Sequence, residues 1–208
     1  MSIRNPQLTR QRLLDTAFHE IHTHGFQGMR VDEVLRLSGL QKGAFYHHFG
    51  SKTELGYAVL EEKVQPLMAA VWFKPLAAIE DPVRDLPDVL KTLDKRIPAS
   101  ILKYGCPLNN LAQEMAAQDD GFRIRVERIF DCWIDTLAQA LERAKAAGYL
   151  RDDVDCQSTA RFIVAGIEGC ISIFKVTGAA EQWKAYRAQV TAYLAALSPH
   201  PHNDNHGG

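Results

Sequence analysis

Residues 31–52 carry the clearest structural signal in the chain, Val-Asp-Glu-Val-Leu-Arg-Leu-Ser-Gly-Leu-Gln-Lys-Gly-Ala-Phe-Tyr-His-His-Phe-Gly-Ser-Lys. Val31, Val34 and Leu35 have the three- and four-residue spacing of a buried helical stripe. Gly39 then allows the left-handed conformation at which helices commonly end. A second short helix is predicted to follow. Two helices joined by a glycine-containing turn form the helix-turn-helix unit, whose second helix lies in the major groove of DNA.

The predicted second helix has two unlike sides. Phe45 and Phe49 lie on the inward side, where a core needs apolar groups. The outward side carries polar and basic side chains that no core requires: Lys42, Tyr46, His47 and His48. Taken alone, this side is equally consistent with an ordinary solvated face, so the neighbouring sequence decides between the two interpretations.

That neighbouring sequence resembles the DNA-binding domain of the TetR family of bacterial transcriptional repressors. The resemblance runs from about Thr9 to about Leu60. It rests on Thr9-Arg10, Leu13-Leu14, Ala17, Gly25-Phe26, the block Lys42-Gly-Ala-Phe-Tyr-His-His-Phe49, and Ser51-Lys-Thr-Glu-Leu55, in the family's order and near the N-terminus of a chain of family length. It implies a sequence-specific, dimeric DNA-binding regulator.

The resemblance also implies that Lys42, Tyr46, His47 and Lys52 face the DNA. Their position and chemistry add five further candidate contacts: Arg30, Gln41, Gly43, Ala44 and His48. We expect Arg30, Tyr46 and Lys52 at phosphates, which supply most of the affinity. Gln41, Lys42 and His47 are expected at base edges, since Gln and Lys match the edge patterns of purines. Gly43 and Ala44 are small enough to let the helix enter the groove closely.

Charge is distributed in the way a DNA reader requires, although the total is not basic. The formal net charge is −1. Residues 1–53 hold seven basic and four acidic residues, whereas the remainder holds seventeen basic and twenty-one acidic ones. A basic end on an acidic body fits a DNA-binding part attached to a different module. A nucleoid-type protein that binds DNA without sequence choice is expected to be more basic.

Signals for other classes of protein are weak. There is no Gly-rich phosphate loop, no Gly-x-Ser-x-Gly elbow and no paired-carboxylate arrangement, so we do not expect an enzyme. A helical enzyme or small-molecule binder without DNA function remains the rival interpretation. The cluster of histidines in residues 19–24 lacks the His-Glu-x-x-His order, and we predict neither a metal site nor a cofactor.

The sequence also predicts the cellular compartment of the protein and the state of its cysteines. No apolar run reaches membrane-spanning length and the N-terminus lacks a hydrophobic signal core, which predicts a cytoplasmic protein without membrane contact. The four cysteines are far apart, with no Cys-x-x-Cys pair: Cys106, Cys132, Cys156 and Cys170. This spacing argues against a disulfide framework.

Helical periodicity is nearly continuous, and we find no strand-like alternation. The pattern predicts an all-α protein of about nine helices, with a helix-turn-helix at about 31–50. We divide the chain into a DNA-binding domain over 1–64, a regulatory and dimerisation domain over 65–197, and a tail over 198–208 that cannot pack. Pro66 is expected to kink a long helix that begins at Ser51.

The resemblance further implies that the last two helices form the interface of a homodimer. Gly166, Gly169 and Cys170 are small residues that let two helices approach closely, although core packing within one chain explains them equally well. A two-fold dimer places its recognition helices about 34 Å apart or somewhat more, and so predicts a palindromic operator.

The resemblance also implies an inducer site, for which there are two candidates. Residues 105–114, Gly-Cys-Pro-Leu-Asn-Asn-Leu-Ala-Gln-Glu, are similar to a Gly-Cys block in a TetR subgroup that includes electrophile-sensing repressors. Cys106 at a helix N-terminus is a candidate sensor, and Lys175 lies where that subgroup carries a lysine that can approach the thiol. The other candidate is an aromatic pocket for an unknown small molecule, lined by Trp72, Phe73, Phe130, Trp133 and Phe174, all of which ordinary core packing also explains.

Overall fold

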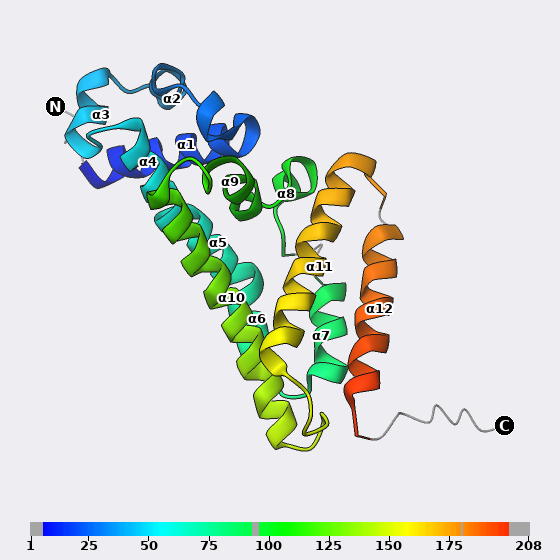
Figure 1. The fold of residues 1–208 in the computed structure, drawn as a ribbon. Helices are drawn as coiled ribbons and strands as arrows, with labels where there is room; N and C mark the ends of the chain where they lie inside the picture. Colours follow the sequence, from blue (N-terminus) through cyan, green and yellow to red (C-terminus); the bar gives the residue numbers. More distant parts are fainter. Residues whose placement is uncertain (1–5, 93–95, 180, 200–208) are drawn as a thin grey trace. The chain divides into compact units, whose positions relative to one another are not determined.

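The computed structural model describes residues 6–92, 96–179 and 181–199 (Figure 1). These residues form helices and turns with no strand, so the predicted all-α class is confirmed. Most of the predicted 198–208 tail lies outside the described residues. No helix in the described ranges combines the length and apolar character needed to span a membrane.

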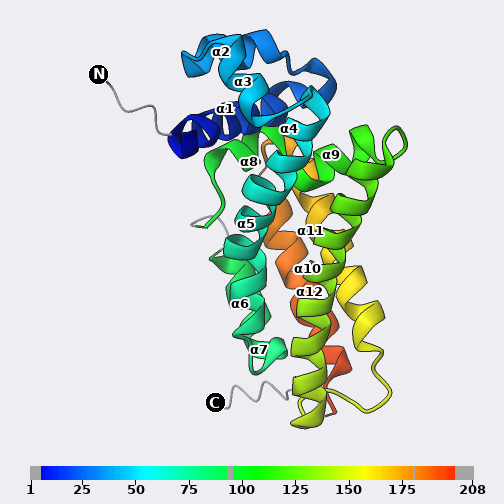
Figure 2. The same ribbon diagram turned by 90° about the vertical axis from the view of Figure 1, so that its left-hand side faces the viewer.

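The helix-turn-helix lies in the first of two compact units, whose described residues are 6–68 and 104–129. Its helices are α1 (Pro6–Gly28), α2 (Val31–Ser38), α3 (Lys42–His48), α4 (Lys52–Val59), the π-helical turn η1 (Leu60–Val64), α5 (Gln65–Met68) and α9 (Pro107–Met115). Helix α10 (Asp120–Ala146) begins in this unit and continues into the second. Helix α1 packs against α2, α4 and α9 (Figure 2).

Local sequence explains the boundaries around the helix-turn-helix. Gly39 adopts φ 65° and ψ 30°, the left-handed conformation predicted for the end of α2. Ser51, where this helix was predicted to begin, caps α4 by accepting a hydrogen bond from the Glu54 amide at 3.1 Å. Gly25 has φ 78° and breaks α1, which resumes for one more turn to Gly28.

The described residues of the second unit are 69–92, 96–103, 130–179 and 181–199. It holds η2 (Ala69–Phe73), α6 (Lys74–Ala77), α7 (Pro82–Lys91), most of α8 (Ala99–Tyr104), the rest of α10, α11 (Cys156–Thr177) and α12 (Glu181–Leu197). Helix α12 lies beside both α7 and α11 (Figure 1). Pro82 and Pro87 both lie within α7, and the fixed φ of Pro82 suits the first turn of a helix.

Prolines explain the two π-helical turns. Pro66 lacks the N–H that an α-helix needs, and η1 ends just before it. Pro75 stands in the same relation to η2. The carbonyl of Val71, four residues before Pro75, instead accepts a hydrogen bond from Arg96 Nη1 at 3.2 Å. The predicted irregularity at Pro66 is therefore a widened helical turn.

Candidate DNA-reading helix and its supports

Helix α3 has the two unlike sides that its sequence predicted. Phe45 and Phe49 are buried, with exposed fractions of 1% and 3%. Lys42 and His47 are exposed, and Tyr46 keeps 57% of its surface in solvent. A large aromatic side chain this open is not placed by the core, so the outward side of α3 is available to a partner.

The outward residues are arranged in two neighbouring pairs. The ammonium of Lys42 lies 5.9 Å from the centre of the Tyr46 ring. The rings of His47 and His48 have centres 4.9 Å apart, and His47 is the more exposed of the two. Burial lowers the pKa of His48, and the neighbouring His47 and Arg10 lower it further.

The packing of the chain does not require glycine at position 43. A Cβ atom on Gly43 would meet no other atom within 4 Å, so the fold itself has room for a side chain there. Gln41 and Lys42 beside it are exposed, while Ala44 is half-buried. A bare backbone on an open helix face is what close approach to a nucleic-acid groove requires.

The two remaining predicted phosphate contacts differ from each other. Arg30 is exposed at the N-cap of α2. Lys52 is half-buried, donates to the backbone carbonyl of Gln27 at 3.0 Å, and lies 4.9 Å from the centre of the Phe26 ring. Burial lowers the pKa of Lys52, while the charge of Glu114 acts to raise it. Its ammonium is therefore held by the chain itself.

Two arginines of α1 support the helix-turn-helix. Arg12 donates to the carbonyl of Ser38, the last residue of α2, at 2.6 Å. Arg10 pairs with Glu62 and lies 5.1 Å from the centre of the Phe49 ring. These cations count toward the basic charge of the N-terminal end, yet they hold the reading helices together.

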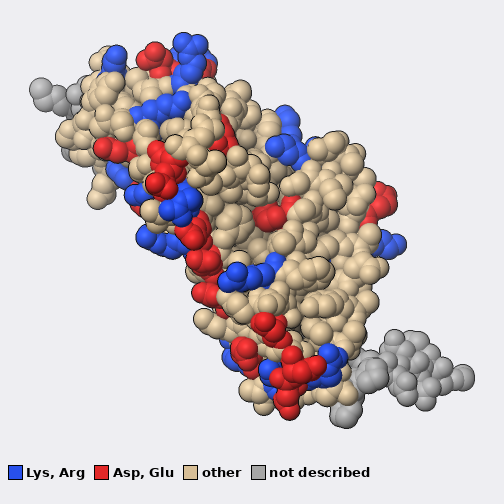
Figure 3. All heavy atoms as spheres, viewed as in Figure 1, with Lys and Arg blue, Asp and Glu red and all other residues tan. Residues whose placement is uncertain are grey.

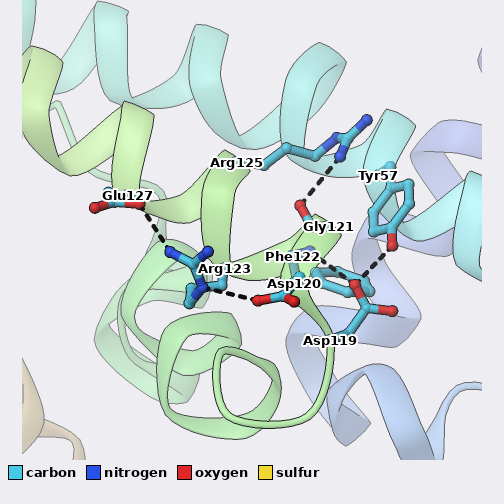
Figure 4. Close-up of polar contacts among 8 residues, drawn as sticks. All are labelled: Tyr57, Asp119, Asp120, Gly121, Phe122, Arg123, Arg125 and Glu127. Atoms are coloured by element: carbon cyan, nitrogen blue, oxygen red, sulfur yellow. Dashed lines mark hydrogen bonds and ion pairs between the residues drawn. The ribbon is translucent and has the colours of Figure 1, made fainter.

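A polar junction links α4 to the segment between α9 and α10 (Figure 4). The Tyr57 hydroxyl and the Asp119 carboxylate point toward one another, with a hydrogen bond of 2.6 Å. Asp119 also accepts from the Phe122 amide at 2.9 Å. Arg125 lies over the Tyr57 ring, 4.1 Å from its centre, and donates to Glu61 at 2.8 Å. The sequence pattern did not predict this junction, because its members are about sixty residues apart.

Cys106 is the N-cap of α9, as predicted, but it is almost fully buried, with 3% exposure. The preceding Gly105 has φ 87°, and its carbonyl lies 2.7 Å from the Nε2 atom of the buried His22. Lys175, the proposed neighbour of Cys106, is exposed on α11 in the second unit.

The other cysteines have distinct environments, and all four are free thiols. Burial raises the pKa of Cys156 and of Cys170 to about 11 in each case. Cys132 is exposed on α10. No group of three residues able to bind a metal ion occurs in the part of the chain that the structure describes.

Of the aromatic pocket candidates, the structure brings Trp72 and Trp133 together. Their ring centres are 4.7 Å apart and both are buried. The Trp133 Nε1–H is buried and has no acceptor among the described residues. Phe73, Phe130 and Phe174 are half-buried. Two open hollows of about 470 and 420 Å³ in this unit are lined by other residues, one beside Phe162 and Tyr193 and one beside Arg96.

The last two helices carry an exposed stripe of apolar and small residues. On α11 it comprises Phe162, Ala165, Gly169, Ile173 and Val176, and on α12 Ala185, Ala188, Ala192 and Ala196. These intervals of three and four residues keep each stripe on one helix face. Figure 3 shows broad uncharged surface over α11 and α12. Gly166 has a different role, because a Cβ there would lie 2.5 Å from the Tyr186 ring within the same chain.

An all-α protein whose helix-turn-helix presents an exposed polar second helix has the architecture of a DNA-binding regulator. Residues 13–59 match the bacterial regulatory proteins of the tetR family, and residues 84–190 match the tetracyclin repressor-like C-terminal domain. The chain belongs to the tetR family of transcriptional regulators, which are generally not enzymes.

Individual relatives support the same assignment over most of the chain. The transcriptional repressor DhaR of Mycobacterium sp. (strain GP1) is 26% identical over 198 residues, which cover 93% of this chain and 94% of DhaR. A TetR regulator structure from Chloroflexus aurantiacus is 26% identical with a TM-score of 0.81, covering 92% and 96% of the two chains. The reduced form of E. coli NemR is 25% identical with a TM-score of 0.72, covering 88% and 96%.

Proposed function

We propose that this regulator is a dimeric repressor that reads a palindromic operator through α3 and is released from it by an inducer in the cytoplasm. The observation that supports it most directly is the outward side of α3, where exposed polar side chains flank the open backbone of Gly43. Lys42, Gln41 and His47 provide base contacts in this proposal. Tyr46 and Arg30 provide phosphate contacts, and Lys52 joins them when its bond to Gln27 opens. Ala44 and His48 are the remaining residues of this proposed DNA-contacting surface.

The exposed stripe on α11 and α12 supports dimerisation through the last two helices. Phe162, Ile173 and Val176 have exposed fractions of 61%, 50% and 85%. Large apolar side chains in line on a helix face favour burial against a second surface. The alanines of α12 allow close approach of a second helix pair. A two-fold arrangement of this kind places the two α3 helices about one DNA turn apart, roughly 34 Å.

For the inducer we propose an electrophile that reacts with Cys106. The Gly-Cys-Pro-Leu-x-Asn-Leu block and the position of the thiol at the start of α9 support this role. Because Cys106 is buried, adduct formation requires the N-terminus of α9 to open, and the adduct then prevents it from closing. This order of events couples modification to movement of α9. The relative NemR was solved in a form described as reduced.

A non-covalent ligand is the second candidate, favoured by one observation. The buried Trp133 Nε1–H without an acceptor is costly, by about 1–3 kcal/mol, unless a bound molecule accepts its hydrogen bond. With the tilted Trp72 ring beside it, this donor suits a flat molecule that carries an oxygen or nitrogen acceptor.

The experiment that tests this function begins with selection of binding sequences from a random DNA pool by the purified chain. Recovery of a palindrome supports an operator-reading dimer, and recovery of no preferred sequence contradicts it. Affinity for the selected DNA is then measured with and without N-ethylmaleimide, for wild type, Cys106→Ser and Cys132→Ser. Release in wild type and Cys132→Ser only assigns sensing to Cys106. Release that persists in Cys106→Ser excludes Cys106 as the sensor.

A further inference from the structure

Glu114, on α9, makes contacts that no sequence pattern indicated. One oxygen of its carboxylate accepts the Phe26 amide at 2.7 Å, and the other accepts the Gln27 amide at 2.8 Å. These two amides follow Gly25, where φ 78° interrupts α1. In a continuous helix these amides would donate to carbonyls of the preceding turn, and the break at Gly25 takes those carbonyls out of reach. The Glu114 carboxylate accepts from the amides instead, and so caps the last turn of α1 from a different helix.

The backbone of Gln27 is held from two directions. Its amide is bonded to Glu114 of α9, and its carbonyl accepts from Lys52, the first residue of α4, at 3.0 Å. The Gln27 side chain adds a hydrogen bond of 2.9 Å to Gln118. One residue therefore joins α9 to α4, and α4 follows closely after α3.

The fit around this carboxylate is tight. A Cβ atom on Gly25 would lie 2.8 Å from a Glu114 oxygen, so a side chain at residue 25 would displace this carboxylate, and the φ of 78° itself favours glycine. Helix α2 begins at Val31, immediately beyond the turn that Glu114 closes. The direction in which the chain leaves α1 is thus fixed by a residue of α9, the helix that has Cys106 as its N-cap.

We propose that Glu114 is a positioning residue for DNA reading: it holds the turn between α1 and α2 in the orientation in which α3 fits its operator, and it transmits movement of α9 to that turn. This role rests on the proposed function. In this role the Glu114 carboxylate links the start of α9 to the reading helix α3, and Glu114 itself does not contact DNA.

The test uses full-length Glu114→Gln, which keeps the size of the side chain and removes the charge that the two amides share. Glu127→Gln is the matched control, since Glu127 is exposed in the same unit and pairs only with Arg123 in the contacts seen here. Both variants remove one negative charge. Charge alone therefore predicts equal or slightly tighter DNA binding for both, whereas loss of positioning predicts weaker operator binding for Glu114→Gln only.

Three quantities are measured for each variant: exchange of the Phe26 and Gln27 amide protons, affinity for the selected operator, and affinity for a scrambled duplex. We expect faster exchange at both amides, about tenfold weaker operator binding and unchanged binding to scrambled DNA in Glu114→Gln. Glu114→Asp, which keeps the charge on a shorter stem, should fall between this variant and wild type. It also serves as the test variant if Glu114→Gln does not fold.

Two results would overturn the role of Glu114 while leaving the proposed function intact. One is wild-type operator affinity in Glu114→Gln despite faster amide exchange. The other is an equal loss on operator and scrambled DNA, which indicates general damage to the unit. A wild-type chain that does not distinguish operator from scrambled DNA would instead overturn the proposed function, and this role with it.

Discussion

The hydroxyl of Tyr57 donates a 2.6 Å hydrogen bond to the carboxylate of Asp119, and so ties α4 to the residue that precedes α10. The approach is close, because a Cβ atom on Gly121 would lie 2.1 Å from the Tyr57 oxygen. Together with the Glu114 contact to α1, this bond means that the segment from α9 to the start of α10 holds two of the helices around the DNA-reading elements. Both contacts lie in one compact unit.

Removing the Tyr57 hydroxyl tests how much this junction contributes to stability. We expect Tyr57→Phe to lower the free energy of unfolding by about 1–2 kcal/mol, because Asp119 loses one of its donors and keeps the Phe122 amide. Urea-induced unfolding measures the change. Tyr149→Phe, in which the altered ring is 46% exposed, is the control and should unfold as wild type does. Equal stability of the two variants would mean that the bond contributes nothing net.

The same pair predicts a dependence of stability on acid. The hydrogen bond from Tyr57 and, to a lesser degree, the Phe122 amide lower the pKa of Asp119 in the folded chain. The unfolded chain therefore binds this proton first, so the stabilisation is fully present above the unfolded pKa of about 4 and is lost as pH falls through the folded value. Unfolding measured along an acid series should show a shallower loss for Tyr57→Phe than for wild type.

Substitutions on the outward side of α3 should separate DNA binding from folding. Lys42→Ala, which removes a proposed base contact, is expected to weaken operator binding by about 1–3 kcal/mol. Gly43→Ala should also weaken binding although the fold has room for the methyl group. Fluorescence anisotropy gives the affinities, and thermal unfolding should match wild type for both. By contrast, Phe45→Ala removes a buried ring and should destabilise the chain by about 3–5 kcal/mol.

Local sequence was sufficient to predict the parts of the DNA-reading unit that depend on neighbouring residues. The end of α2 at Gly39, the cap at Ser51 and the burial of Phe45 and Phe49 each follow from spacing within one or two helical turns. These features are determined by backbone conformation and by the alternation of apolar and polar sides, which a single sequence displays directly.

The contacts that hold this unit to α9 were not predictable in the same way. Glu114 and Phe26 are 88 positions apart, and nothing beside either residue indicates the other. The predicted role of Lys52 as a phosphate contact was incomplete for the same reason, since its bond to Gln27 depends on how α4 packs against α1. Residues 104–129 read as part of the C-terminal region, whereas packing groups them with the helix-turn-helix.

Thiol reactivity should follow burial and pKa in a defined order. Cys132 is exposed and should react first with N-ethylmaleimide. Cys156 and Cys170, whose pKa burial raises to about 11, hold little thiolate at neutral pH and should react last. Cys106 should react at the rate at which α9 opens. Peptide mass spectrometry over a time course gives the order, and Cys132→Ser should remove the fast phase alone. A fast phase that survives in Cys132→Ser would contradict the burial of Cys106.

A charge on the exposed stripe of α11 should separate the proposed dimer. Val176, at 85% exposure, meets little of its own chain, so Val176→Glu should leave the fold unchanged. In a dimer the same carboxylate would be buried against apolar surface, at a cost on the order of several kcal/mol. Sedimentation should therefore show a monomer for Val176→Glu and a dimer for wild type. Ile124→Glu, a comparable change on α10 outside the stripe, should remain dimeric. Dimers from all three chains would place the interface away from this stripe.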